Sequence, residues 1–146
     1  DREGLESIVG EVAALGSTVA PIYGDVMDPA SFDLFWDQVE RLTDRIDILV
    51  NVPGGVARMM FEATSRQNHA DNIRYNYGYH IDSCQRALPL LKKSAAGGSI
   101  INFTSITWGV ADGDCVCYVT SKAAVFGMTR ALATEIMALP PQEKAK

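Results

Sequence analysis

The stretch that decides the fold is residues 98–125, GSIINFTSITWGVADGDCVCYVTSKAAV. Its first part, residues 99–103, is short, apolar and β-rich, which predicts a strand. A helix is expected to begin near Val116 and to extend to about Leu139, where two prolines follow. A strand followed by a helix is part of a β-α-β unit, so the same order is expected elsewhere in the chain.

The region before residue 45 shows a similar alternation of patterns. Apolar residues recur at helical spacing from Leu5 to Leu15, and Gly16 stands where a left-handed C-cap would lie. Residues 18–23 are β-rich and predict a strand. Asp28-Pro29 then supplies an N-cap and a first helical residue for a second helix, whose apolar stripe ends at Leu42.

The middle of the chain continues the alternation. Residues 46–50 form a compact apolar run that predicts a strand buried on both faces. Residues 65–93 carry an apolar stripe of helical period, which predicts a long helix bent at Pro89. The order helix-strand-helix-strand-helix-strand-helix predicts an α/β fold, a doubly wound parallel sheet in one domain over residues 1–146, with ligand sites at the carboxyl ends of the strands.

Composition narrows the classes of partner. The chain has 146 residues, 47% of them hydrophobic, which suits one globular domain, and its net charge of −5 disfavours nucleic acid and anionic membranes. No apolar run is long enough to span a bilayer and the first residues do not form a signal peptide, so we expect a cytoplasmic protein with a small-molecule substrate. The three cysteines, Cys84, Cys115 and Cys117, are expected to be reduced thiols, and no metal site is expected.

Three side chains in the deciding stretch suggest chemistry. Tyr118 and Lys122 are four residues apart, which places them on one helix face. Free tyrosine, with a pKa of about 10, is a poor base at neutral pH, and a nearby ammonium favours the phenolate. Ser105 ends the predicted strand and could donate a hydrogen bond to a substrate oxygen as negative charge develops there. Taken alone, however, this Tyr-Lys spacing also occurs by chance on exposed helices.

The surrounding residues favour the catalytic interpretation. Residues 98–105 and 118–125 resemble the short-chain dehydrogenase/reductase family, including the gap of thirteen residues between Ser105 and Tyr118. Further matches to this family occur in the same order along the chain, at Asp25-Val26, at residues 48–54, and at Asn76 ahead of Pro89. The resemblance implies a Rossmann-like fold, here an incomplete dinucleotide-binding domain, in an NAD(P)-dependent oxidoreductase that interconverts an alcohol and a carbonyl.

The family's residue roles carry over by position. The resemblance implies that Tyr118 is the general acid/base, that Lys122 favours its phenolate form and binds the nicotinamide ribose, and that Ser105 orients the substrate oxygen. Asn76 would hold a water that links the lysine to solvent. These four residues would form the catalytic tetrad.

Cofactor contacts follow from the same resemblance. Asp25 and Val26 match positions beside the adenine, and Asn51 and Gly54 match the loop under the cofactor, which would be NAD or NADP, with the preference unreadable. Between Asn51 and Gly54 this sequence departs from the family pattern at two positions, where Val52-Pro53 replaces Asn-Ala. The proline removes one backbone donor.

The resemblance covers an internal part of the family's chain. The family's first two strands with their Gly-rich phosphate turn would precede Asp1, and its substrate-covering segment would follow Lys146. We therefore expect these 146 residues alone to bind NADH and NADPH weakly or not at all and to be inactive. The family's helical interface implies a homodimer or homotetramer through the long helix and the last helix. The alternative is a truncated, non-catalytic member that acts only through this helical surface.

Overall fold

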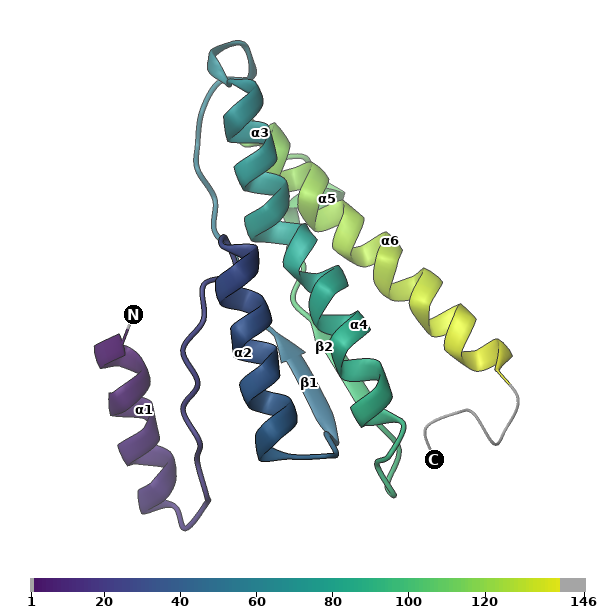
Figure 1. Ribbon diagram of the computed structural model, residues 1–146. Coiled ribbons are helices and arrows are strands. Elements are labelled where there is room, and N and C mark those ends of the chain that lie inside the picture. The colour runs from purple at the N-terminus through teal and green to yellow at the C-terminus, as the bar shows by residue number, and fades with distance from the viewer. Residues whose placement is uncertain (1, 140–146) are drawn as a thin grey trace. The chain divides into compact units, whose positions relative to one another are not determined.

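The computed structural model describes residues 2–139 and divides into two compact units, Asp1–Leu42 and Thr43–Lys146 (Figure 1). The first unit contains helices α1 (Arg2–Ala14) and α2 (Pro29–Leu42). Both predicted helix ends are confirmed by local chemistry. Gly16 follows α1 with a φ of 81°, and the Asp28 carboxylate accepts a hydrogen bond from the Ala30 amide at 3.1 Å.

The strand predicted for residues 18–23 is wrong. The segment is irregular, because the described residues form a single two-stranded sheet, both of whose strands lie in the second unit. A β-rich sequence becomes a strand only when a neighbour completes its hydrogen-bond ladder. The segment ends in a turn, where the amide of Asp25 donates to the Ser31 hydroxyl at 3.0 Å.

The second unit is built on a parallel pair of strands, β1 (Ile48–Asn51) and β2 (Ser99–Asn102). Their register places Ile48 opposite Ser99 and Asn51 opposite Asn102. The two strands therefore end side by side, and the next amide along, that of Phe103, donates to the carbonyl of Asn51 at 3.1 Å. Both strand predictions in this unit are confirmed to within two residues.

The prediction that the first of these strands is buried on both faces is wrong. Ile48 is 59% exposed and Val50 is 47% exposed, whereas Asn51 is buried. Successive side chains of a strand point to opposite faces. Within the second unit, helix α4 (Tyr79–Leu91) contacts β1, and Ile48 and Val50 remain accessible.

The long helix forms, but in three parts. Helix α3 (Arg66–Ile73) leads into a π-helical turn, η2 (Arg74–Gly78), and then into α4. Pro89 lies inside α4, so the departure from α-helical geometry comes at η2 rather than at the proline. The helix α3 and the turn η2 contact helix α6 (Val116–Ala138), while α4 contacts both strands.

Two short elements complete the second unit, η1 (Phe61–Ala63) and α5 (Thr107–Val110). Its buried apolar residues come mainly from α4, and they are Tyr79, Cys84, Ala87, Leu90, Leu91, Cys115 and Val125. Several polar side chains are buried with them: Asn51, Asn76, His80, Ser83, Ser94, Ser121 and Lys122. This many buried polar groups in a small unit mark the region where function is to be sought. None of the helices between residues 2 and 139 combines the length and the apolar character needed to cross a membrane.

Candidate active site

Lys122 lies on α6 with its ammonium directed into the second unit. The residue is only 3% exposed, and its Nζ donates a hydrogen bond to the carbonyl of Phe103, just after β2, at 3.0 Å. Burial lowers the pKa of this lysine. No ion pair with an acidic residue is found for it among residues 2–139. A buried cation without a countercharge is costly, and such groups are concentrated at functional sites.

Asn76 lies in the π-helical turn and is fully buried. Its amide nitrogen donates to the carbonyl of Gly55 at 3.0 Å, and its oxygen accepts from the Gly55 amide at 2.9 Å. This two-way bond fixes the loop after β1 to the helix. The nitrogen also lies 3.3 Å from the carbonyl of Asn72, a group that a regular helix would bond to a backbone amide. Single π-helical turns are frequent at functional sites.

Gly54 brings Lys122 and Asn76 together. A Cβ at this position would lie 2.9 Å from the lysine Nζ and 3.0 Å from the asparagine Oδ1. The backbone of the loop therefore contacts the ends of both side chains, and only glycine fits without a shift. Three of the residues predicted for the site thus converge on one point near the carboxyl ends of β1 and β2.

Tyr118 stands one helical turn before Lys122 on α6. Its ring centroid is 5.9 Å from the lysine Nζ, and the residue is half-buried. The predicted placement of the two side chains on one helix face is therefore found in the structure.

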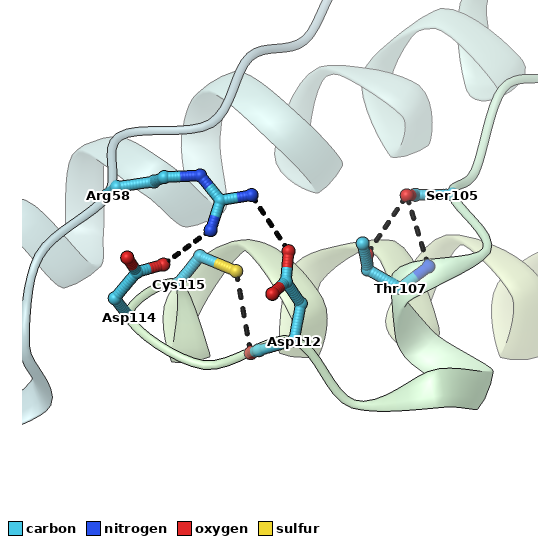
Figure 2. Close-up of polar contacts among 6 residues, drawn as sticks. All are labelled: Arg58, Ser105, Thr107, Asp112, Asp114 and Cys115. Carbon is cyan, nitrogen blue, oxygen red and sulfur yellow. Dashed lines mark hydrogen bonds and ion pairs between the residues drawn. The ribbon is translucent and has the colours of Figure 1, made fainter.

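Ser105 follows two residues after Phe103, at the start of the segment that leads into α5. Its hydroxyl oxygen accepts from the amide of Thr107 at 3.3 Å and from the Thr107 hydroxyl at 2.9 Å (Figure 2). Both bonds described for this hydroxyl use its oxygen as acceptor, so its proton is left to donate to another group. Ser105 lies only two residues after Phe103, and the Phe103 carbonyl accepts the hydrogen bond from the Lys122 ammonium.

Asn51, predicted to contact the cofactor, is the last residue of β1. Its side chain is 3% exposed and donates to the Oδ1 of Asn102 at 2.8 Å, while the Asn102 amide donates to the Thr129 hydroxyl at 3.0 Å. The Asn51 side chain thus takes part in a partly buried network that joins β1, β2 and α6. The cofactor contact predicted for Asn51 stays a prediction.

Asp25 and Val26 lie in the first unit, away in sequence from the other predicted site residues. The Asp25 carboxylate accepts from the amide of Met27 at 2.8 Å, a local turn contact. The adenine contacts predicted for these two residues stay predictions.

Tyr79 was missed by the sequence patterns. Its hydroxyl donates to the carbonyl of Pro53 at 2.7 Å, so the loop that carries Gly54 is held on a second side. Burial raises the pKa of Tyr79, which keeps the hydroxyl protonated as a donor. Its position three residues after Asn76, on the same helical face, was the available signal.

His80 is fully buried beside Tyr79. Its Nε2 lies 3.3 Å from the Tyr79 hydroxyl oxygen. Because that hydroxyl donates to Pro53, its oxygen can accept a hydrogen bond from the Nε2–H tautomer of the imidazole. Burial and the positive charge of Lys122 lower the pKa of His80 to about 4, so the imidazole is neutral near pH 7.

A cavity of about 270 Å³ lies between α4, β2 and α6. Its lining is mainly apolar and consists of Leu88, Leu91, Lys92, Gly98, Ile100, Asn102, Thr129, Leu132, Ala133, Ile136 and Met137. None of the four predicted catalytic residues lines it. The three cysteines are free thiols, and residues 2–139 hold no group of three or more side chains suited to bind a metal.

Comparison with known proteins places this geometry in a family context. Residues 1–139 match a family model described as short chain dehydrogenase. D-xylose 1-dehydrogenase of Caulobacter vibrioides is 32% identical over 128 residues, which are 86% of this chain and 50% of that protein. D-threitol dehydrogenase of Mycolicibacterium smegmatis is 34% identical over 136 residues, 92% of this chain and 52% of that protein. The chain thus spans about half the length of these relatives.

A solved structure agrees with the sequence matches. A crystal structure assigned to the short-chain dehydrogenases/reductases, from Burkholderia xenovorans, superposes with a TM-score of 0.82 at 28% identity. The match covers 94% of this chain and 52% of that one. The two-stranded parallel sheet and its helices therefore correspond to part of a larger Rossmann-like fold.

Proposed function

Because the chain belongs to the short-chain dehydrogenase family, we propose that the whole protein is an NAD(P)-dependent oxidoreductase that interconverts an alcohol and a carbonyl. The observation that carries the proposal is the buried ammonium of Lys122. It lies against Gly54, which the Asn76 side chain also approaches, and it is 5.9 Å from the Tyr118 ring centroid.

Tyr118 is proposed as the general acid/base. Its hydroxyl gives a proton to the carbonyl oxygen during reduction and takes the hydroxyl proton of the substrate during oxidation. Half-burial leaves the ring accessible from one side, as a group that meets substrate must be.

Ser105 is proposed to orient the substrate oxygen. Two donors from Thr107 hold its oxygen and direct its own proton away from them. A donor held in advance stabilises the negative charge that develops on the substrate oxygen, without a reorganisation cost during the reaction.

Asn76 and Lys122 are proposed to supply the proton path and part of the cofactor site. The Phe103 carbonyl accepts a hydrogen bond from one of the three ammonium N–H groups, so the other two can donate to the hydroxyls of a ribose and to a water. The Asn76 oxygen lies 3.0 Å from where a Cβ at residue 54 would stand, close to this ammonium, and can help to hold that water.

These residues suit a nicotinamide cofactor. The absence of a side chain at Gly54 lets the loop backbone pass directly against the ends of Lys122 and Asn76, so both polar groups lie at the loop proposed to run under the cofactor. When bound, NAD or NADP would accept or supply the hydride, and Lys122 would hold the cofactor through its ribose. Asp25, Val26, Asn51 and Gly54 remain the proposed further contacts of the cofactor.

The test uses the full-length protein and the variant Tyr118→Phe. Substrate choice starts with small sugars and polyols, because two relatives are named for D-xylose and D-threitol. The variant should lose about 10²- to 10⁴-fold in kcat, the usual contribution of general acid-base catalysis. Its affinity for NADH or NADPH should stay within about twofold, because the lost hydroxyl serves the proton transfer.

A matched control is Tyr23→Phe, which removes the same hydroxyl from a tyrosine bonded to Glu6 of α1. This variant should keep its activity. If the two variants were equally active, Tyr118 would not be the acid/base. Absence of turnover in the wild-type protein would favour the non-catalytic alternative, which acts through its helical surface.

A further inference from the structure

Arg58 joins two loops that lie more than fifty residues apart in the sequence. Its Nη2 is 2.8 Å from the Asp112 carboxylate and its Nη1 is 2.6 Å from the Asp114 carboxylate (Figure 2). Beside this ion cluster, the amide of Met59 donates to the carbonyl of Asp114 at 2.5 Å. The loop over residues 52–60 and the loop over residues 111–115 are therefore held by charges and by backbone.

Both loops lead directly to the candidate site. The first contains Gly54, which contacts the ends of Lys122 and Asn76. The second runs into α6, whose third residue is Tyr118. A contact that fixes these loops to one another also fixes the start of α6 relative to the loop under the proposed cofactor.

The second loop has a backbone that needs such support. Ala111 and Asp114 have φ values of 56° and 51°, in the left-handed region that residues with a side chain adopt at a cost. Cys115 completes the loop with its thiol 3.6 Å from the Asp112 carbonyl, and the residue is only 3% exposed. Contacts from outside the loop must hold this conformation, and those of Arg58 and Met59 are of that kind.

We propose that Arg58 is a positioning residue, which clamps Asp112 and Asp114 and thereby sets Tyr118 for proton transfer; this rests on the proposed function. The planar guanidinium reaches two carboxylates with separate nitrogens, which a lysine cannot do with its single ammonium. The two carboxylates would otherwise repel one another. Salt is expected to screen these ion pairs, since the Arg58 side chain is 54% exposed.

The first test measures the loop directly and needs no substrate. Cys115 in the full-length protein is labelled with N-ethylmaleimide, and the rate is followed by mass spectrometry in wild type and Arg58→Gln. We expect the variant to label about three- to tenfold faster, as the loss of a partly exposed ion network implies. Burial raises the pKa of the Cys115 thiol, the two aspartates raise it further and Arg58 lowers it, so loss of the arginine charge alone would slow the labelling. A faster rate therefore reports opening of the loop.

Cys84 serves as the internal reference. It is as buried as Cys115, at 3% exposed, but lies on α4. Its labelling should stay at the wild-type rate if the variant opens the loop alone. A parallel rise at both cysteines would mean that Arg58 only stabilises the fold, and this would overturn the proposal.

The second test measures catalysis. Arg58→Gln should lower kcat by about three- to tenfold and leave the affinity for NADH or NADPH unchanged. In wild type, about 0.5 M salt should lower kcat by screening the ion pairs, and in the variant this effect of salt should be absent. Arg58→Lys should fall between the two proteins because it keeps one of the two contacts. Arg45→Gln is the matched control, since Arg45 pairs with Asp47 at similar exposure, 53% and 52%.

The two proposals can fail separately. If wild type shows no turnover, the labelling still decides whether Arg58 holds the loops, and the missing activity counts against the oxidoreductase. If Arg58→Gln matches wild type in labelling of Cys115, in kcat and in the effect of salt, the clamp is overturned while the proposed function stands.

Discussion

Acid is expected to destabilise the protein through His80. The residue is fully buried, and burial together with Lys122 lowers its pKa to about 4, against an ordinary value of 6.5. A proton added to this imidazole would create a second buried cation beside the ammonium of Lys122. The folded state therefore binds the proton much more weakly than the unfolded state does.

The sign and the size of the effect follow from these two pKa values. Between pH 6.5 and pH 4 the unfolded chain holds more protons on His80, so the free energy of unfolding falls as the pH falls through this range. One unit of pKa corresponds to about 1.36 kcal/mol, which gives a loss of about 2 kcal/mol between pH 7 and pH 5. The loss is complete below pH 4, at about 3 kcal/mol at most.

The assay is urea unfolding of the full-length protein at pH 7 and pH 5, with His80→Gln compared with wild type. Glutamine keeps a polar group at the position and does not titrate in this range. Wild type should therefore lose about 2 kcal/mol more than the variant on acidification. His69→Gln, on the partly exposed side of α3, is the matched control for the chemical change. An equal loss of stability in wild type and His80→Gln would refute the reasoning.

Further predictions concern packing around the site. Gly54→Ala should lower kcat at least about tenfold and cost about 1–3 kcal/mol of stability, because its Cβ would lie 2.9 Å from the Lys122 Nζ. The control is Gly127→Ala on α6, where a Cβ meets nothing within 4 Å; it should keep activity and gain about 0.5–1 kcal/mol. Thermal unfolding and steady-state kinetics of both variants check this. Asn51→Ala should cost about 1–3 kcal/mol in urea unfolding, because it removes a buried side chain and leaves the partly buried oxygen of Asn102 without this donor, and a cost near zero would show that the network does not matter to stability.

The parts of the fold that were predictable depend on local chemistry. The N-cap at Asp28 and the glycine after α1 act within a few residues, and both helix ends were predicted correctly. A strand depends on a neighbour that the local pattern does not contain. The strands in residues 46–50 and 99–103 pair in parallel, but residues 18–23 have no such neighbour among the described residues.

The site was predictable where a motif fixed spacing along one helix. Tyr118 and Lys122 share a face of α6 because helical geometry puts residues four apart together. The bond from Asn76 to Gly55 depends on a π-helical turn that no residue pattern announces. The ion pairs of Arg58 join residues 54 and 56 positions apart, a distance at which charge patterns carry no pairing information.

The π-helical turn η2 also controls the phase of the long helix. A turn with one extra residue rotates everything after it by about 100° relative to a regular helix. On α3, the Asn72 side chain accepts a hydrogen bond from Ser121 of α6, and beyond the turn α4 contacts both strands, so the rotation at η2 sets how these two contacts are oriented to one another. Loss of one residue from Arg74–Gly78 would leave a regular helix that can satisfy one partner but not both. Changes of length should therefore be rarer in this segment than changes of residue type, unlike in an exposed loop.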